Sequence, residues 1–490
     1  MSEDSKPTLG WNFDNTYLSL PQKFYSLQKP SPVGKPSLVV FNHALAEELG
    51  LEAWATHAEV WLGTSSGNLL AEGSEPLAQA YAGHQFGNFT MLGDGRAILL
   101  GEHLGSSGQR IDVQLKGAGR TSYSRGGDGR ATLSAMLREY LMSEAMHHLG
   151  IPTSRSLAVV RTGEPVYREQ VQEGAVLTRL AFSHIRVGTF EYARYILSVE
   201  ELRQLMEYTL QRHYPHLLEE ENKALTLLEA VMDKQADLLV QWMRVGFIHG
   251  VMNTDNMSIA GETIDYGPCA FLNAYHRRKV FSSIDTQGRY AYGNQPYIAH
   301  WNLACLATAL LPLIHEDNQE GVKLAQEVLN RFPQKYESRW LEMMRRKLGW
   351  QGEDEGDLDL VQELLVWMEG HSADYTNTFL YLMGDPEIQD PLYENEGFVQ
   401  WKEKWEKRQQ QFGGDRASGL LMMEGNNPVF IPRNHLVEQA LWSASQENDL
   451  GPMDRLLERL RQPYRQHLGV LEYKLGPLGG DGAYRTFCGT

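Results

Sequence analysis

The sequence predicts an α+β fold in which a strand-rich N-terminal part precedes a mainly helical part. Residues 111–116 alternate apolar and polar side chains with the period of two that a half-buried strand shows. Two further strand-like runs follow at 156–162 and 175–181. Beyond about residue 198 the apolar spacing becomes helical, most clearly over 224–245. Strands and helices that are separated along the chain in this way are typical of α+β proteins.

Length and charge narrow the class of protein further. A chain of 490 residues is long enough for about two to four structural units. Hydrophobic residues make up 42% and charged residues 22%, as in soluble globular proteins. The formal net charge of −17 argues against nonspecific binding of nucleic acid or of an anionic membrane surface. Any bound polyanion must therefore be small and held locally.

The cysteines and the N-terminus indicate a cytoplasmic protein. Cys269, Cys305 and Cys488 are too few and too scattered for a disulfide framework or a zinc site. Residues 1–7 are acidic and show no secretory or organellar presequence. The most apolar run, 303–314, is too short for a membrane span, and we interpret it as a buried helix. We expect partners other than nucleic acid or membranes.

Short glycine-containing segments separate the predicted strands. Residues 81–88 are predicted to form a loop, and 89–100 two strands around the turn at 93–95. Lys116 ends the next strand on its polar face, away from the core. In the helical part, 257–264 is predicted to form a small hairpin.

Four residues along the chain define a candidate catalytic site. Glu139 lies among apolar side chains on a predicted helix, 131–149, so its carboxylate requires a cation. The order of residues is that of the lysine, the helix glutamate and the two metal ligands of a protein kinase: Lys116, Glu139, Asn256 and Asp265. We therefore predict a Lys116–Glu139 ion pair and a Mg²⁺ site at Asn256 and Asp265. Each residue alone has an ordinary explanation, such as a solvated lysine or a simple turn; the order of the set carries the prediction.

This order predicts a protein-kinase-like two-lobed fold with an N-terminal extension and additional C-terminal helices. The predicted segments are the extension (1–75), a nucleotide-binding N-lobe (76–197), a C-lobe with the metal site (198–330), a C-terminal helical region (331–475) and a flexible tail with Cys488 (476–490).

Two departures from a protein kinase bear on the reaction. Counting back from Asn256, the position of the kinase's catalytic base is Val251, which cannot accept a proton. Asp255 is the nearby carboxylate that could act instead. The glycine segment also lacks the full kinase pattern. Phosphorylation of a hydroxyl by the usual mechanism is therefore not expected.

The strand-rich part carries an excess of arginines, which are Arg96, Arg120, Arg125, Arg130, Arg179 and Arg186. The dipeptide Asp128-Gly129 lies among them. One guanidinium group can bind two phosphate oxygens at once. The excess of arginines therefore indicates a phosphate chain held in a pose that differs from that in a protein kinase. For a single arginine a surface ion pair is the simpler explanation, and we assign Arg120 and Arg125 to that class.

Histidines and cysteines outside this set have mainly structural interpretations. His84 and His249 are expected to be loop or core histidines satisfied by the backbone. Cys269 and Cys305 are expected to be inert core residues. Cys488 lies in a glycine-rich terminal segment, where an exposed thiol would be open to redox chemistry.

Longer motifs connect these residues to a known family. They are YAGHQFG (81–87), QLKGAGRT (114–121), SRGGDGR (124–130), HGVMNTDN (249–256) and DYGP (265–268). Together they resemble the selenoprotein O family, known in bacteria as YdiU. The resemblance extends from about residue 10 to the end of the chain.

The resemblance implies a pseudokinase fold that binds ATP in a flipped orientation. AMP would then pass to Ser, Thr or Tyr hydroxyls of proteins, including the enzyme itself. The family's catalytic positions map onto Asp255 as proton acceptor, beside Lys116 and Glu139, with Mg²⁺ or Mn²⁺ on Asn256 and Asp265. Its nucleotide contacts map onto Gly93, Gly95, Arg96, Lys116, Asp128, Gly129, Arg179, Arg186 and Asp265.

Two alternatives to adenylyl transfer stay open, which are uridylyl transfer from UTP with Mn²⁺ and a non-catalytic ATP-binding scaffold. A small-molecule phosphotransferase is disfavoured by Val251. Cys488 matches a C-terminal selenocysteine or cysteine of the family. Phe281 occupies the position where bacterial relatives often have a second cysteine, which argues against an intramolecular disulfide. Mixed disulfides between Cys488 and another thiol stay open.

Overall fold

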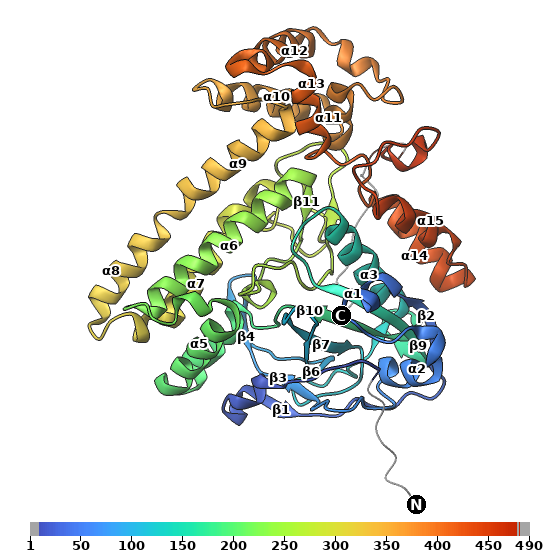
Figure 1. Cartoon of the computed structure of the whole chain (residues 1–490), viewed down its shortest axis with the longest axis vertical. Helices are drawn as coiled ribbons and strands as arrows, with labels where there is room; N and C mark the ends of the chain where they lie inside the picture. Colours follow the sequence, from blue (N-terminus) through green and yellow to red (C-terminus); the bar gives the residue numbers. More distant parts are fainter. Residues whose placement is uncertain (1–8, 478–479, 481–490) are drawn as a thin grey trace, which may run out of the picture.

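The computed structural model describes residues 9–477 and residue 480 (Figure 1). A strand-rich part forms one end of the molecule, and long helices lead away from it to a cluster of C-terminal helices at the other end. The predicted α+β class is confirmed, with a large antiparallel sheet followed by a helical region. Cys488 lies outside the described residues.

An eight-stranded sheet forms the strand-rich part. Its strands lie in the order β1 (Tyr25–Leu27), β3 (Leu77–Gln79), β6 (Ala97–Leu104), β7 (Arg110–Lys116), β10 (Val171–Ala181), β9 (Arg155–Tyr167) and β2 (Ser37–Phe41), with β8 (Ala131–Thr132) also paired to β10. All these pairs are antiparallel. The predicted strands at 111–116, 156–162 and 175–181 are confirmed. The N-terminal segment supplies both edge strands, β1 and β2.

Helices cover the sheet and make up most of the rest of the chain. The first group is α1 (His43–Glu48), α2 (Ala58–Ser66), α3 (Leu133–His148), α4 (Val187–Ile196), α5 (Val199–His213), α6 (Lys223–Val245), α7 (Gln295–Ile314) and α8 (Asn318–Leu329). The second is α9 (Phe332–Leu348), α10 (Asp357–His371), α11 (Tyr375–Met383), α12 (Glu396–Gln409), α13 (Arg416–Glu424), α14 (Asn434–Trp442) and α15 (Gly451–Leu460). The predicted helix at 224–245 is confirmed as α6.

Strand β7 is buried on both faces, which corrects the prediction of a half-buried strand. Its apolar residues Val113 and Leu115 lie in a core with Trp61 of α2. Its polar residues, including Gln114 and Lys116, are also buried, because α3 packs across the other face of the sheet. Lys116 therefore does not face solvent, and burial of its charge requires partners.

The segment from residue 81 to residue 100 differs from the prediction. Residues 81–88 are not a loop, because β4 (Ala82–Gln85) pairs with β5 (Asn88–Met91) in a separate hairpin. Its turn residues Phe86 and Gly87 have φ of 50° and 86°, the left-handed conformation of a tight hairpin turn. β5 does not pair with β6, so residues 93–95 connect two sheets instead of closing a hairpin.

Helix α3 begins and ends within two residues of the predicted 131–149. The Thr132 side chain accepts the Ala135 N–H at its N-terminus, and Gly150 follows its C-terminus with φ of 77°. Helices α14 and α15 from the end of the chain pack on α3, and Arg138 pairs with Glu438 of α14 at 2.7 Å. The helix is thus held between the sheet and the C-terminal helices.

Helix α7 contains the apolar run at 303–314, which was predicted to be a buried helix. The segment Tyr292–Ile314 is long and apolar enough to cross a membrane, but half of its apolar window is buried inside the protein. Leu303, Leu306 and Leu310 are fully buried, and α7 packs against α4, α6 and α8. The prediction of a buried helix is confirmed for the face of α7 that carries these three leucines.

The hairpin predicted at 257–264 is wrong. Ser258 forms a bridge with Arg186 and Thr263 one with Thr153, so this segment pairs with the strand-rich part instead of with itself. The short pair formed by β11 (Phe247–Ile248) and β12 (Ala270–Phe271) lies on either side of it in sequence. Tertiary partners thus replace the local pairing that the sequence suggested.

Glu262 in this segment gives a prediction for stability. The Phe182 N–H donates to its carboxylate at 2.8 Å, and burial raises its pKa from the ordinary 4.5 to about 8. Between these values the folded protein keeps a proton that the unfolded chain releases, so stability falls as pH rises. Glu262→Gln removes this loss, and its unfolding free energy relative to wild type should increase by roughly 3–4 kcal/mol between about pH 5 and pH 8.

Denaturant unfolding across this pH range measures the effect. Glu424→Gln on exposed α13 is the matched control, with no expected change. A difference between Glu262→Gln and wild type that does not vary with pH would contradict a protonated Glu262 in the fold.

Candidate functional site

Lys116 and Glu139 form a buried ion pair at the centre of the sheet. Lys116 is the last residue of β7, and its Nζ lies 2.6 Å from Oε2 of Glu139 on α3. Both side chains are buried. The prediction that Glu139 meets a cation is confirmed, because α3 crosses the sheet at the end of β7 and directs the carboxylate toward the lysine.

Asp265 joins this pair from the loop between β11 and β12. Its Oδ1 lies 2.8 Å from Lys116 Nζ and 2.6 Å from Arg179 NH1, and its Oδ2 lies 2.6 Å from Arg186 NH1. Burial alone would raise the pKa of Asp265, but the three surrounding cations hold this pKa well below its usual range. The backbone of Asp265 has φ of 60°, a conformation that is uncommon outside glycine and concentrates at functional sites.

Arg179 and Arg186 complete a group of five charged side chains, which we call the Asp265 cluster: Lys116, Glu139, Arg179, Arg186 and Asp265. Arg179 on β10 also contacts Glu139 at 3.0 Å. Within the cluster three cations face two carboxylates, and the carboxyl groups of Asp94 and Asp255 lie close by. Two guanidinium groups and one ammonium group gathered in one place can bind phosphate oxygens.

Sequence reasoning missed three residues around the cluster. Gln114 accepts from Arg179 Nε at 3.1 Å, and Tyr81 lies under the Arg186 guanidinium, 4.6 Å from Cζ to the ring centre. Asp94 accepts the Gln79 N–H at 3.0 Å, and burial raises its pKa to about 6. Gln114 lies on the same face of β7 as Lys116, so the alternating pattern could have predicted that it lies beside the cluster. Tyr81 and Asp94 gave no signal beyond their place in glycine-containing segments.

Asp255 and Asn256 lie on a short helical turn, η5 (Thr254–Asn256), beside the cluster. Arg186 NH1 donates to the Asp255 carbonyl at 2.7 Å, which ties this turn to the arginine that binds Asp265. Burial raises the pKa of Asp255 to about 6. Among the described residues, no donor lies within hydrogen-bond distance of its Oδ1. Asn256 donates to the Val251 carbonyl at 2.9 Å.

The remaining predicted nucleotide residues lie on glycine segments outside the cluster. Gly93 and Gly95 pass close to Tyr123, and Arg96 is half-buried at the start of β6. Asp128 is exposed and pairs with Arg168 at 2.9 Å instead of with a member of the cluster. Its neighbour Gly129 accepts the Gly119 N–H at 3.0 Å, which ties this segment to the residues that follow β7.

Arginines and histidines with structural interpretations give mixed outcomes. Arg120 donates to the carbonyls of Gly126 and Gly127 at 3.0 and 2.9 Å, so it braces its own loop where a surface ion pair was expected. His249 is a buried histidine whose Nε2 donates to the Ile264 carbonyl at 2.9 Å, as predicted. His84 differs from the prediction, because its ring contacts the Glu191 carboxylate.

Cys269 and Cys305 agree with an inert role. Burial raises the pKa of Cys269 to about 11 and that of Cys305 to about 12. Both sulfurs therefore remain protonated near neutral pH, and the thiolate that reacts or binds metal is scarce.

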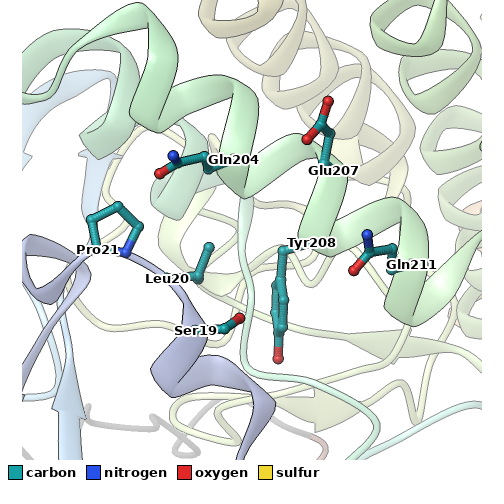
Figure 2. A pocket seen from close by; sticks show the side chains of 7 residues that line it. All are labelled: Ser19, Leu20, Pro21, Gln204, Glu207, Tyr208 and Gln211. Carbon is teal, nitrogen blue, oxygen red and sulfur yellow. The ribbon is translucent and has the colours of Figure 1, made fainter.

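A cavity of about 420 Å³ lies between the N-terminal segment and α5, away from these residues (Figure 2). It is lined by Ser19, Leu20, Pro21, Gln204, Glu207, Tyr208 and Gln211. None of the predicted site residues lines it. The cavity therefore does not belong to the candidate site.

The cluster and the turn beside it define a class of protein. A lysine fixed by a helix glutamate, two buried arginines and a carboxylate with an amide neighbour form an arrangement that can bind a nucleotide by its phosphates. Val251 is buried at the position of a kinase base, and the carboxylate nearby belongs to Asp255. The class is that of nucleotide-dependent transferases, without the residue that a kinase uses as base.

Comparison with known proteins gives the family. The family profile described as protein adenylyltransferase SelO matches residues 7–461. A protein of Brevibacillus brevis named protein nucleotidyltransferase YdiU is 55% identical over 489 residues, 99% of this chain and 100% of the relative. Proteins of Geobacillus kaustophilus and Bacillus cytotoxicus with the same name are each 54% identical over 481 residues, 98% of this chain and 99% and 98% of their own lengths. The chain belongs to the SelO/YdiU family of protein nucleotidyltransferases.

Gly93 gives a prediction for the site. Its φ is 125°, and an added Cβ would lie 2.8 Å from Cβ of Tyr123. Gly93→Ala should therefore lower the unfolding free energy by roughly 1–3 kcal/mol. Thermal unfolding measures this loss. Gly105→Ala is the matched control, because its Cβ would meet only the Gln109 carbonyl at 3.7 Å and its backbone is not left-handed. Equal melting temperatures for the two variants would show that Gly93 is not constrained.

Proposed function

We propose that this enzyme transfers AMP from ATP to Ser, Thr or Tyr hydroxyls of proteins, itself included. The observation that carries the proposal is the Asp265 cluster, which gathers three cations in one place, beside a turn that offers Asp255 and lacks a base at Val251. We also propose that 76–197 and 198–330 are the two lobes of a kinase-like fold. The antiparallel sheet with α3 across it, and the helical part that follows, support this arrangement.

In this proposal the cluster binds the phosphates of ATP. Lys116, Arg179 and Arg186 now neutralise Asp265, and phosphate oxygens would take over part of these contacts. Glu139 holds Lys116 in place, since the pair is buried and its separation would leave a charge without a partner. Gly93, Gly95, Arg96, Asp128 and Gly129 would contact the remainder of the nucleotide, as the family resemblance implies.

Asp255 is the proposed proton acceptor. The acceptor hydroxyl oxygen bonds to the α-phosphorus, the bond from that phosphorus to the oxygen shared with the β-phosphate breaks, and pyrophosphate leaves. The hydroxyl proton passes to a carboxylate oxygen of Asp255. Its Oδ1 lacks a donor among the described residues, so it is free to accept this proton.

Asn256 and Asp265 are the proposed ligands of Mg²⁺ or Mn²⁺. Carboxylate and amide oxygens suit these hard cations. The ion would neutralise charge on the phosphate oxygens.

Isotope position tests the reaction. Incubation with α-labelled ATP should label the enzyme and added acceptor proteins, whereas γ-labelled ATP should leave both unlabelled. Lys116→Ala or Asp265→Ala should reduce the α-label by at least about 100-fold, since Lys116 would neutralise the phosphates directly and Asp265 would hold the metal ion that does so. Transfer of the γ-label would contradict the proposal and indicate a kinase. Binding of ATP with no transfer under any metal would indicate a scaffold, and an increase in melting temperature with ATP detects that binding.

Manganese binding tests the metal ligands without reference to activity. Free Mn²⁺ gives an electron paramagnetic resonance signal that weakens when the ion binds. Wild-type protein with ATP should bind Mn²⁺ and so weaken the signal of the free ion. The affinity for Mn²⁺ should fall by at least about tenfold in each of two variants, Asp265→Asn and Asn256→Leu. An unchanged Mn²⁺ affinity in both variants would show that these residues are not the ligands.

Uridylyl transfer is the second candidate reaction. The printed names of the relatives specify nucleotidyl transfer without naming the base. α-Labelled UTP with Mn²⁺, in the same assay, distinguishes the two: a higher transfer rate from UTP than from ATP would replace AMP by UMP in the proposal.

A further inference from the structure

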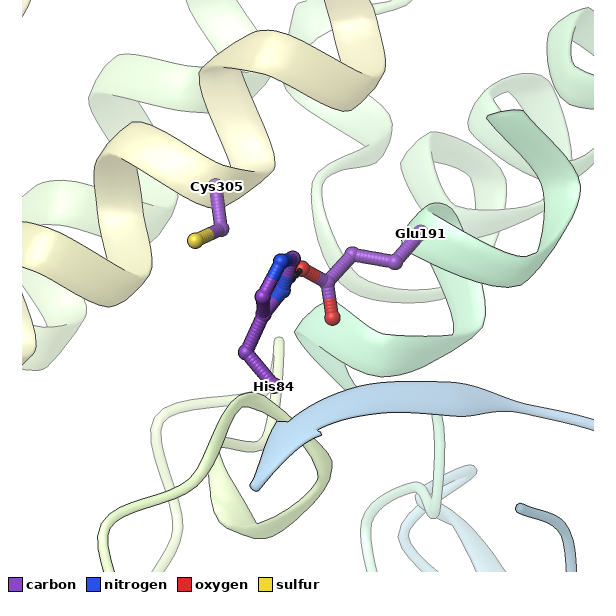
Figure 3. Close-up of side chains that lie close together, drawn as sticks. All are labelled: His84, Glu191 and Cys305. Atoms are coloured by element: carbon purple, nitrogen blue, oxygen red, sulfur yellow. Dashed lines mark hydrogen bonds and ion pairs between the residues drawn. The ribbon is translucent and has the colours of Figure 1, made fainter. Parts of the chain in front are cut away.

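A hydrogen-bonded chain joins the β4–β5 hairpin to the turn that carries Asp255. We call it the Thr254 clamp, and it consists of His84, Glu191 and Thr254. The Thr254 hydroxyl accepts the His84 N–H at 2.7 Å and donates to Glu191 Oε2 at 2.5 Å. The His84 ring donates from Nδ1 to the other oxygen of the same carboxylate. Figure 3 shows His84, from the end of β4, directed at Glu191 on α4.

Cys305 of α7 lies beside this chain, so a cation site has to be considered. Its Sγ and the donor atoms of His84 and Glu191 lie within 4.8 Å of one another (Figure 3). Both Glu191 oxygens, however, already accept hydrogen bonds from protein groups. Burial also raises the pKa of Cys305 to about 12, which keeps the sulfur protonated. The group is therefore better described as a closed set of hydrogen bonds than as a metal site.

The same strand touches the turn at several further points. Gln85 Nε2 lies 3.5 Å from Asp255 Oδ2, and the Phe86 N–H donates to Asn253 Oδ1 at 3.1 Å. An added Cβ at Gly83 would lie 2.9 Å from Asp255 Cβ. The hairpin backbone thus lies directly against the turn, and a side chain at position 83 would displace it.

Helix α4 closes the turn from the other side. An added Cβ at Gly188 would lie 3.3 Å from Asp255 Cα, and Arg186 at the N-terminus of α4 donates to the Asp255 carbonyl at 2.7 Å. Glu191, one turn further along α4, binds Thr254. Thr254 and Glu191 are fully buried, so the bonds between them are shielded from water.

We propose that Thr254, with His84 and Glu191, is a positioning residue for Asp255. The clamp fixes the backbone of the turn, so that the Asp255 carboxylate is held where an acceptor hydroxyl arrives, while the phosphates are bound by the separate Asp265 cluster. The inference rests on the proposed role of Asp255 in nucleotidyl transfer. It predicts that loss of the clamp lowers turnover without loss of ATP binding.

Thr254→Val and Thr254→Ser separate the hydroxyl from the shape of the side chain. Valine cannot accept the His84 N–H or donate to Glu191, and kcat for transfer should fall by about 10–100-fold. The Kd for ATP should stay within about threefold of wild type, since the Asp265 cluster is intact. Serine keeps the hydroxyl and should keep kcat within about threefold. His84→Phe removes one bond from a partly exposed position and should lower kcat in the same direction by a smaller factor.

Hydrogen exchange tests the clamp independently of transfer. The His84 amide loses its acceptor in Thr254→Val, so exchange in peptides covering 82–88 and 250–257 should be at least about tenfold faster than in wild type and Thr254→Ser. Thr308→Val is the matched control, because Thr308 is exposed on α7 and its hydroxyl binds only the Ala304 carbonyl of its own helix, at 2.8 Å. It should change neither measurement.

Two results would overturn the inference. The first is a kcat that does not separate the variants as expected: Thr254→Val equals wild type at saturating ATP, or Thr254→Val and Thr254→Ser lose kcat equally. The other is unchanged exchange in both peptides of Thr254→Val. If wild type transfers no nucleotide, the proposed function fails by that result, and the exchange measurement alone decides whether the clamp holds the turn.

Discussion

The structure depends on holding five charged side chains together, four of them buried and the fifth, Asp265, half-buried. Charges removed from water are tolerated only when each has partners of opposite sign at hydrogen-bond distance. Lys116, Glu139 and Asp265 meet this condition together with Arg179 and Arg186. These residues come from β7, α3, β10, the start of α4 and the loop before β12, so the folded arrangement of both parts of the chain is needed to satisfy them.

The surrounding architecture serves to hold these elements against one another. Helix α3 is fixed between the sheet and helices α14 and α15, which come from the end of the chain. The segment with Glu262 pairs with Thr153 and Arg186 on the strand-rich part. The β4–β5 hairpin, which stands apart from the large sheet, lies against the turn of Asp255. The Asp265 cluster and the turn of Asp255 are thus held by different parts of the fold.

Local sequence patterns predicted most helices and strands well where apolar side chains face a core. Helices α3 and α6 and strands β7, β9 and β10 agree with the apolar spacing, because their apolar side chains pack in a core. Predictions were wrong where distant partners replaced local ones. Residues 257–264 pair with the strand-rich part, and residues 93–95 connect two sheets, since glycine-containing segments adopt whichever pairing the neighbouring elements provide.

By itself, the sequence determined the α+β class and the pairing of Lys116 with Glu139. These follow from side-chain chemistry and order along the chain, which are local or need only one contact. Only the tertiary structure decided that Arg179 and Arg186 both bind Asp265, that Asp128 lies outside the cluster, and that His84 and Thr254 share Glu191. Such contacts join residues far apart in the chain, and neither spacing nor residue order indicated which partner each of these side chains would meet.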